Sequence, residues 1–206
     1  MMKAKLLRGW ISLFSMALVL PLHAELKLPA LFSDNMVLQR NVSVPVWGWA
    51  DDGEIITVQF RGQKVTTTAQ NGAWSLRLRR LSAGGPDVLT ISSPSRTLQF
   101  TNVLVGEVWI ASGQSNMEWP LTQTDDSAAA IASATNSQIR FFMVPNVKAD
   151  APTTRISSSW KVCSPDMIGG YRAVGYYFAR DLVAARKGPV GIIQYAWGGP
   201  PEEVWM

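Results

Sequence analysis

The feature that most constrains the fold is an apolar, β-branched run over residues 103–111, which ends abruptly in the sequence Ser-Gly-Gln-Ser-Asn at 112–116. Such a run predicts a buried strand with Ser115 on the turn at its carboxyl end. In open α/β sheets, ligands bind in the crevice beyond the carboxyl ends of the strands. A hydroxyl on such a turn, beside backbone N–H groups, is placed to act as a nucleophile. Met117 stands where the nucleophile motif Gly-x-Ser-x-Gly has its second glycine, so the motif is incomplete. The spacing therefore also fits a serine hydroxyl that only caps the turn.

Strand and helix patterns alternate after this turn. Apolar runs over 139–144 and 190–196 predict two further buried strands, and helices are predicted over about 126–134 and about 172–187. This β-α-β-α-β order predicts a parallel, flavodoxin-like α/β sheet with right-handed crossovers. The first and third strands then end at the same edge, so the serine turn and the glycines that follow the third strand can meet there.

Local signals add detail to these elements. The first helix is expected to take its caps from residues 125–127, which are Asp, Asp and Ser. The second helix is expected to have one apolar face, formed by Val174, Tyr177, Phe178 and Leu182. Prolines and glycines between 145 and 170 indicate a long irregular connection.

Residues 25–102 have a different pattern. Short β-branched runs recur between turn signals such as Asn71-Gly72, which predicts a small all-β sandwich. We therefore divide the chain into this β-sandwich domain and an α/β domain over 103–206. A carbohydrate-binding module that uses Trp47, Trp49 or Trp74 is the alternative for the first domain, although alternating strand aromatics more often face a core.

The first residues predict export. Three basic residues precede an apolar run over 10–20, and small residues follow it, which is the pattern of a secretory signal peptide over 1–24. The run is too short to span a membrane, so we expect a secreted or periplasmic protein without a membrane span. Without this segment 16 basic residues remain against 15 acidic ones, so the charge gives no reason to expect a nucleic-acid partner.

The composition also bears on other kinds of chemistry. Cys163 is the only cysteine, so no intrachain disulfide can form, and a buried small apolar residue is the expected role. The one histidine, His23, lies in the predicted signal peptide. No metal site is therefore expected, and no glycine-rich phosphate loop is seen, so no cofactor is predicted.

The stretch over residues 106–121 resembles the signature of the sialate O-acetylesterase family, which belongs to the SGNH-type serine hydrolases. The stretches over 31–40 and 191–199 agree with it. The resemblance implies a carboxylic ester hydrolase that removes O-acetyl groups from sugars or glycans. It also implies an SGNH-type hydrolase domain, here incomplete with three parallel strands, behind an accessory β-domain.

The resemblance, together with the expected convergence at the sheet edge, assigns roles to five residues. Ser115 is the expected nucleophile. Its backbone N–H and that of Gly198 or Gly199 are the expected oxyanion donors, because glycine allows close approach of the backbone. The amides of Gln114 and Asn116 are expected to orient the substrate.

Two departures from the family pattern qualify these expectations. Pro200 stands where the family usually has threonine, and Pro201 follows it, which removes a hydroxyl and two N–H donors. The Asp-x-x-His block of the family is absent, so we expect the N-terminal part of a longer esterase with almost no activity alone. A non-catalytic glycan-binding protein, or an acetylxylan or other polysaccharide acetylesterase, remains as an alternative, and the oligomeric state stays open.

Overall fold

A computed structural model describes residues 25–151, 153–154 and 156–199. The predicted signal peptide over 1–24 lies outside the described residues. The strands are β1 (Val37–Gln39), β2 (Val44–Trp49), β3 (Ile55–Phe60), β4 (Gln63–Thr68), β5 (Ala73–Leu78), β6 (Gly84–Ser92), β7 (Thr97–Gly113), β8 (Asn136–Met143), β9 (Trp160–Cys163) and β10 (Val190–Ala196). The helices are α1 (Ser115–Glu118), the 3₁₀ turn η1 (Leu121–Gln123), α2 (Ser127–Ala132), α3 (Pro165–Ile168) and α4 (Ala173–Arg186).

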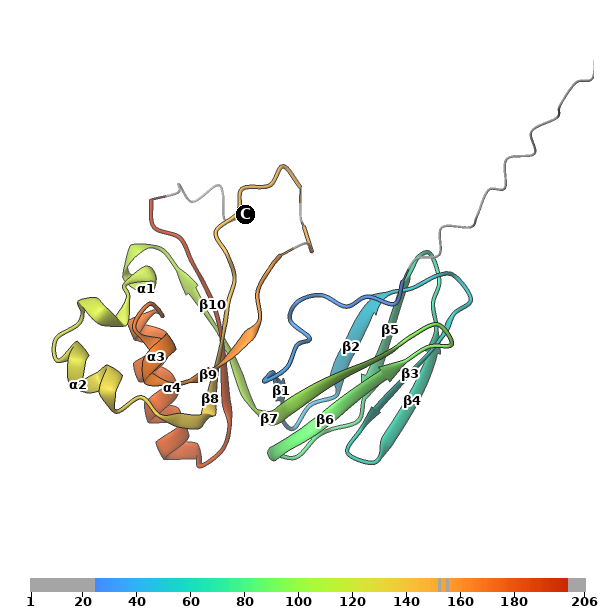
Figure 1. Cartoon of the computed structure of the whole chain (residues 1–206), viewed down its shortest axis with the longest axis horizontal. Coiled ribbons are helices and arrows are strands. Elements are labelled where there is room, and N and C mark those ends of the chain that lie inside the picture. Colours follow the sequence, from blue (N-terminus) through green and yellow to red (C-terminus); the bar gives the residue numbers. More distant parts are fainter. Residues whose placement is uncertain (1–24, 152, 155, 200–206) are drawn as a thin grey trace, which may run out of the picture.

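Strand β7 joins the two halves of the molecule. Its first part pairs antiparallel with β6, and its last seven residues pair parallel with β10. Figure 1 shows this long strand running from the all-β half into the half that carries the helices. The predicted domain boundary at residue 102 falls inside β7, so the division into two domains stays a prediction.

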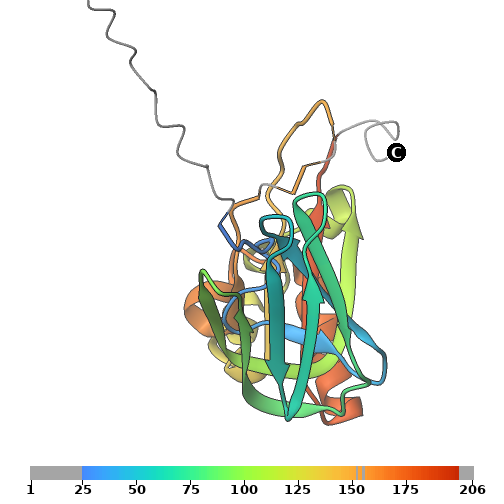
Figure 2. The ribbon, with the colours of Figure 1, turned by 90° about the vertical axis from the view of Figure 1, so that its right-hand side faces the viewer.

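The all-β half has the alternation that the sequence predicts. Strands β4, β3, β6 and β7 are neighbours in an eight-stranded sheet that continues through β10, β8 and β9, and β1 also pairs with β7. Strands β2 and β5 form a separate antiparallel pair. Figure 2 views this half from its outer side. Alternate residues of both sheets, such as Val46 in β2 and Val58 in β3, are fully buried in one hydrophobic core. The predicted turn at Asn71-Gly72 is confirmed, since both residues have positive φ and lead into β5.

In the second half, β7, β10 and β8 are parallel, as predicted, and β9 adds an antiparallel edge strand. The flavodoxin-like order is wrong, because that order places the first strand between the second and the third. Here β10, the third of them, lies between the other two. Its residues Val190, Gly191 and Ile192 are all buried, and a strand of this kind favours the centre of a parallel sheet.

Three local predictions need correction. The connection over 145–170 contains β9 and α3, so it is not irregular throughout. Asp126, the N-cap of α2, makes no side-chain capping bond, because its backbone is left-handed. In α4 the buried residues are small or aromatic at 173, 175, 176 and 179, whereas Val174 and Phe178 are exposed. The reason is close packing: a Cβ at Gly175 would lie 2.4 Å from the amide nitrogen of Gln194 in β10.

Helices α1 to α4 lie on the side of strands β8, β9 and β10 that faces away from the all-β half (Figure 1). Tyr176 and Ala179 of α4 pack with Ile192 of β10 in a second hydrophobic core. Within the part of the chain that the structure describes, no helix combines the length and the apolar character that a membrane span requires.

Candidate active site

Ser115 lies directly beyond the carboxyl end of β7, as the first residue of α1, and it is exposed. Gly113, the last residue of β7, has φ +155°, and a Cβ there would lie 2.6 Å from the side chain of Met117. The carbonyl of Gln114 accepts hydrogen bonds from the N–H groups of Met117 and Glu118, both at 3.0 Å. The glycine thus permits a tight turn that closes immediately into a helical turn and leaves the serine at its surface.

The loop after β10 lies against this turn. The N–H of Trp197 donates to the carbonyl of Gly113 at 3.1 Å, which continues the pairing of β10 with β7. A Cβ at Gly198 would lie 3.3 Å from the Cα and 3.4 Å from the Cβ of Ser115. The predicted meeting of the serine turn and the glycine loop at one sheet edge is therefore found in the structure.

The N–H of Gly198 already has a partner. It donates to Oε2 of Glu118 at 2.7 Å, so in this arrangement it is not available to an oxyanion. Of the two glycines named from the sequence, Gly199 is the better candidate donor. It is exposed, has φ +91°, and has open space where a Cβ would be.

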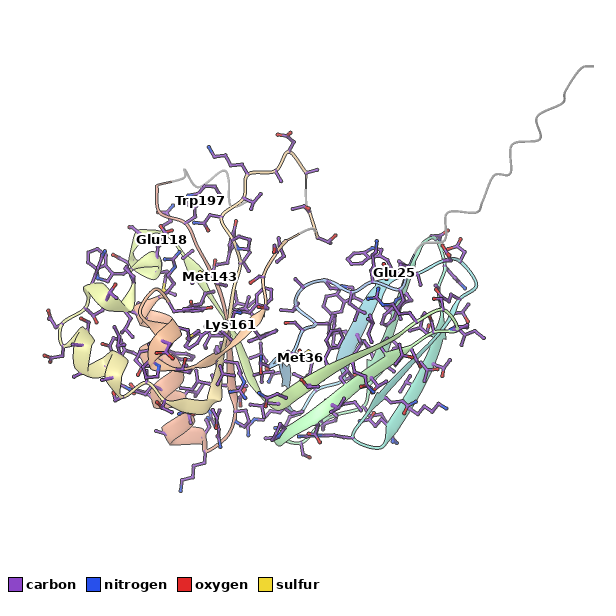
Figure 3. The ribbon with its side chains drawn as sticks, viewed as in Figure 1. Glu25, Met36, Glu118, Met143, Lys161 and Trp197 are labelled. Carbon is purple, nitrogen blue, oxygen red and sulfur yellow. The ribbon has the colours of Figure 1, made fainter. Side chains whose placement is uncertain are left out.

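Glu118 is held from several sides. Its Oε1 accepts hydrogen bonds from Nη2 of Arg172 at 3.3 Å and from Nδ2 of Asn146 at 3.2 Å. Nη1 of Arg172 also donates to the backbone carbonyl of Glu118 at 3.0 Å. Figure 3 shows Glu118 and Trp197 at the same end of the sheet. The carboxylate therefore connects α1 to the loop after β10.

Sequence reasoning gave no role to this group. Glu118 stands within the stretch that resembles the family, but Arg172 and Asn146 had no signal, because they come from distant segments. Gln114 and Asn116 are both exposed on the serine turn, and their part in substrate orientation remains a prediction.

The buried position of Cys163 does not favour a role as a nucleophile. Cys163 is buried, and its thiol donates to the carbonyl of Ala134 at 3.1 Å. Burial raises the pKa of the thiol to about 11, against a smaller opposite effect of Arg140, so at neutral pH it is not a thiolate. Among residues 25–151, 153–154 and 156–199, no three His, Cys, Asp or Glu side chains are grouped to hold a metal ion.

The fold is shared with a carbohydrate acetylesterase. The chain superposes on the crystal structure of such an enzyme from Xanthomonas citri with a TM-score of 0.85 and 43% identity, covering 88% of this chain and 42% of that one. No family model matches the chain.

The curated relatives are more specific. The chain is 30% identical over 194 residues to human sialate O-acetylesterase and 31% identical over 198 residues to the rat protein. These matches cover 84% and 85% of this chain, but only 37% and 36% of the relatives. The predicted resemblance to sialate O-acetylesterases, which are carboxylic ester hydrolases, is thus confirmed over most of the chain, and the chain spans less than two fifths of their length.

Proposed function

We propose that this chain carries the nucleophile of a secreted or periplasmic carbohydrate O-acetylesterase, with Ser115 as that nucleophile and O-acetylated sugars of the sialate type as substrates. The described residues then comprise an accessory β-sandwich and the first part of an SGNH-type hydrolase domain. The observation that supports this most is the approach of Gly198 to the backbone and Cβ of Ser115 at the carboxyl ends of two paired parallel strands.

The proposed chemistry is acyl transfer to water. Oγ of Ser115 attacks the acetyl carbonyl and loses its proton to a base, the sugar hydroxyl leaves with a proton, and water then releases acetate from the serine. Backbone N–H groups of Ser115 and Gly199 stabilise the oxyanion, and one such donor is typically worth about 10²–10³ in rate. We propose that this base is a histidine, as the resemblance to the family implies, and the segments that the structure describes contain none.

The test measures hydrolysis of 4-nitrophenyl acetate and of an O-acetylated sialic acid by the full-length protein. Ser115→Ala should lower kcat by at least about 10³, as loss of a catalytic serine does. Ser112→Ala is the matched control, since Ser112 is an exposed serine three residues earlier in β7 and should keep full activity. Equal loss in both variants, or full activity of Ser115→Ala, would refute the assignment.

Sugar binding by the all-β half is the second candidate function. A hollow of about 580 Å³ on β2 and β5 is lined by Trp47, Trp49 and Trp74. Trp74 is buried and belongs to the core, whereas Trp47 is 36% exposed and stacks edge-on against Phe32. Binding of acetylated oligosaccharides that Trp47→Ala abolishes, with hydrolysis of small esters unchanged, would support this function; binding that survives the substitution would remove it.

A further inference from the structure

Another pocket lies far from Ser115. It has a volume of about 350 Å³ and is formed where β6 and the loop before β10 meet along β7. Its lining includes Asn102 and Leu104 of β7, which precede the serine by more than ten residues along an extended strand. The pocket is therefore at the other end of the sheet from the candidate active site.

The pocket contains a buried arginine without a counter-ion. Arg140 of β8 is 2% exposed, and no carboxylate of the described residues forms an ion pair with it. Nη1 donates to the carbonyls of Ser137 and Ile139, and Nη2 makes a 3.4 Å bond to Oδ1 of Asn102. The Nε–H has no hydrogen-bond partner. A buried charged group is unfavourable when some of its N–H donors lack hydrogen-bond acceptors, and folded proteins rarely contain one.

The charge of the surroundings has one sign. Burial lowers the pKa of Arg140 to about 10, so the guanidinium is still a cation at neutral pH. Lys187, at the end of α4, also lines the pocket, and neither Asp nor Glu is among the lining residues that the structure describes. Two cations at one pocket, with no carboxylate between them, favour an anion.

We propose that this pocket binds a small oxyanion, a carboxylate or phosphate group, between Arg140 and Lys187. The Nε–H and the adjacent Nη2–H form one edge of the planar guanidinium, which is the group that matches two oxygens of such an anion. In Arg140 this edge has one donor without a partner and one with a long bond. The second cation, from Lys187, adds attraction without a fixed geometry.

Isothermal titration calorimetry of the chain with inorganic phosphate, and separately with acetate, tests the proposal at constant ionic strength set by chloride. One site is expected for at least one of the two anions, and the preferred anion identifies the geometry that the pocket selects. Arg140→Lys keeps the charge but removes the planar guanidinium edge with its two donors, so the affinity for the anion should fall by at least about tenfold.

Lys187→Met keeps the length of an exposed side chain and removes its charge, so the affinity should fall by about threefold to fivefold. Lys161→Met, at the exposed position of β9, is the matched control and should bind as the wild type does. If Arg140→Lys does not fold, the comparison of Lys187→Met with Lys161→Met decides the matter. Absence of binding for both anions, or equal affinities in all folded variants, would overturn the proposal.

Discussion

The hydrogen bond from Gly198 to Glu118 makes a prediction that does not depend on activity. In Glu118→Ala the N–H of Gly198 loses its 2.7 Å acceptor, and Arg172 loses the carboxylate at 3.3 Å. Because no other described element holds the N–H of Gly198, the loop after β10 should open locally more often. The first effect to expect is faster amide hydrogen exchange at Gly198.

The size of the effect follows from the geometry. A hydrogen bond to a charged group typically contributes about 1.5–3 kcal/mol, and an exposed ion pair contributes less. The side chain of Glu118 is 30% exposed, so about 1–2 kcal/mol is a reasonable expectation. At about 1.4 kcal/mol for each factor of ten, exchange at Gly198 should accelerate by about fivefold to thirtyfold. Glu118→Gln keeps an oxygen acceptor without the charge and should show a smaller acceleration.

Native-state exchange followed by NMR measures this directly. Glu54→Ala is the control, because Glu54 lies in the all-β half, between β2 and β3, and accepts a hydrogen bond from Ser95 instead. The exchange rate of Gly198 should be the same in that variant as in the wild type. If Glu118→Ala also leaves the exchange rate at Gly198 unchanged, then the carboxylate of Glu118 does not hold the loop after β10, and the prediction is wrong.

Two further predictions concern stability. Gly106→Ala should lower the free energy of unfolding by about 1–3 kcal/mol in urea titrations, because its Cβ would lie 2.0 Å from the backbone oxygen of Pro189. Gly170→Ala, with open space at the Cβ, should change it little, and equal stability of the two variants would contradict the packing argument. The pKa of the Cys163 thiol is about 9 in the unfolded chain and about 11 in the folded protein. The free energy of unfolding should therefore fall as the pH rises from 9 through 11. This fall should be about 2–3 kcal/mol larger than in Cys163→Ser. Parallel pH profiles for the two proteins would show that this thiol is not protected by the fold.

The strands that could be predicted are those with strong local patterns. The run over 190–196 matches β10 residue for residue, because it is mostly apolar, with Gln194 as its one strongly polar residue. The length of β7 was not predicted, because the sequence pattern separates a short strand over 97–100 from the apolar run over 103–111, with Asn102 between them. Asn102 has φ +54°, yet the strand continues through it beside a register shift in the pairing with β6. Strand β9 was missed because four residues carry too little pattern to separate a strand from a loop.

The part of the candidate site that the sequence predicts is the part that the order and direction of the strands determine. Ser115 and Gly198 follow two parallel strands, and that alone brings their loops to one edge. The partner of the Gly198 N–H was not predictable, because Glu118 is 80 residues away in sequence and is oriented by Arg172 and Asn146. Contacts of this kind depend on side chains from three segments, and no single stretch of sequence records them.

The register between β7 and β10 connects the middle of the molecule to the candidate site. The N–H of Glu107 donates to the carbonyl of Pro189 at 2.9 Å, and Gly106 leaves room for that approach. From there seven residue pairs run without a shift until Ala196 lies opposite Gly113. A slip of one residue would move the glycine loop by about 3.3 Å and turn its strand to the other face. In the observed register a Cβ at Gly198 would lie 3.3 Å from the Cα of Ser115. A glycine nine residues before the serine therefore helps to determine whether the proposed site can form.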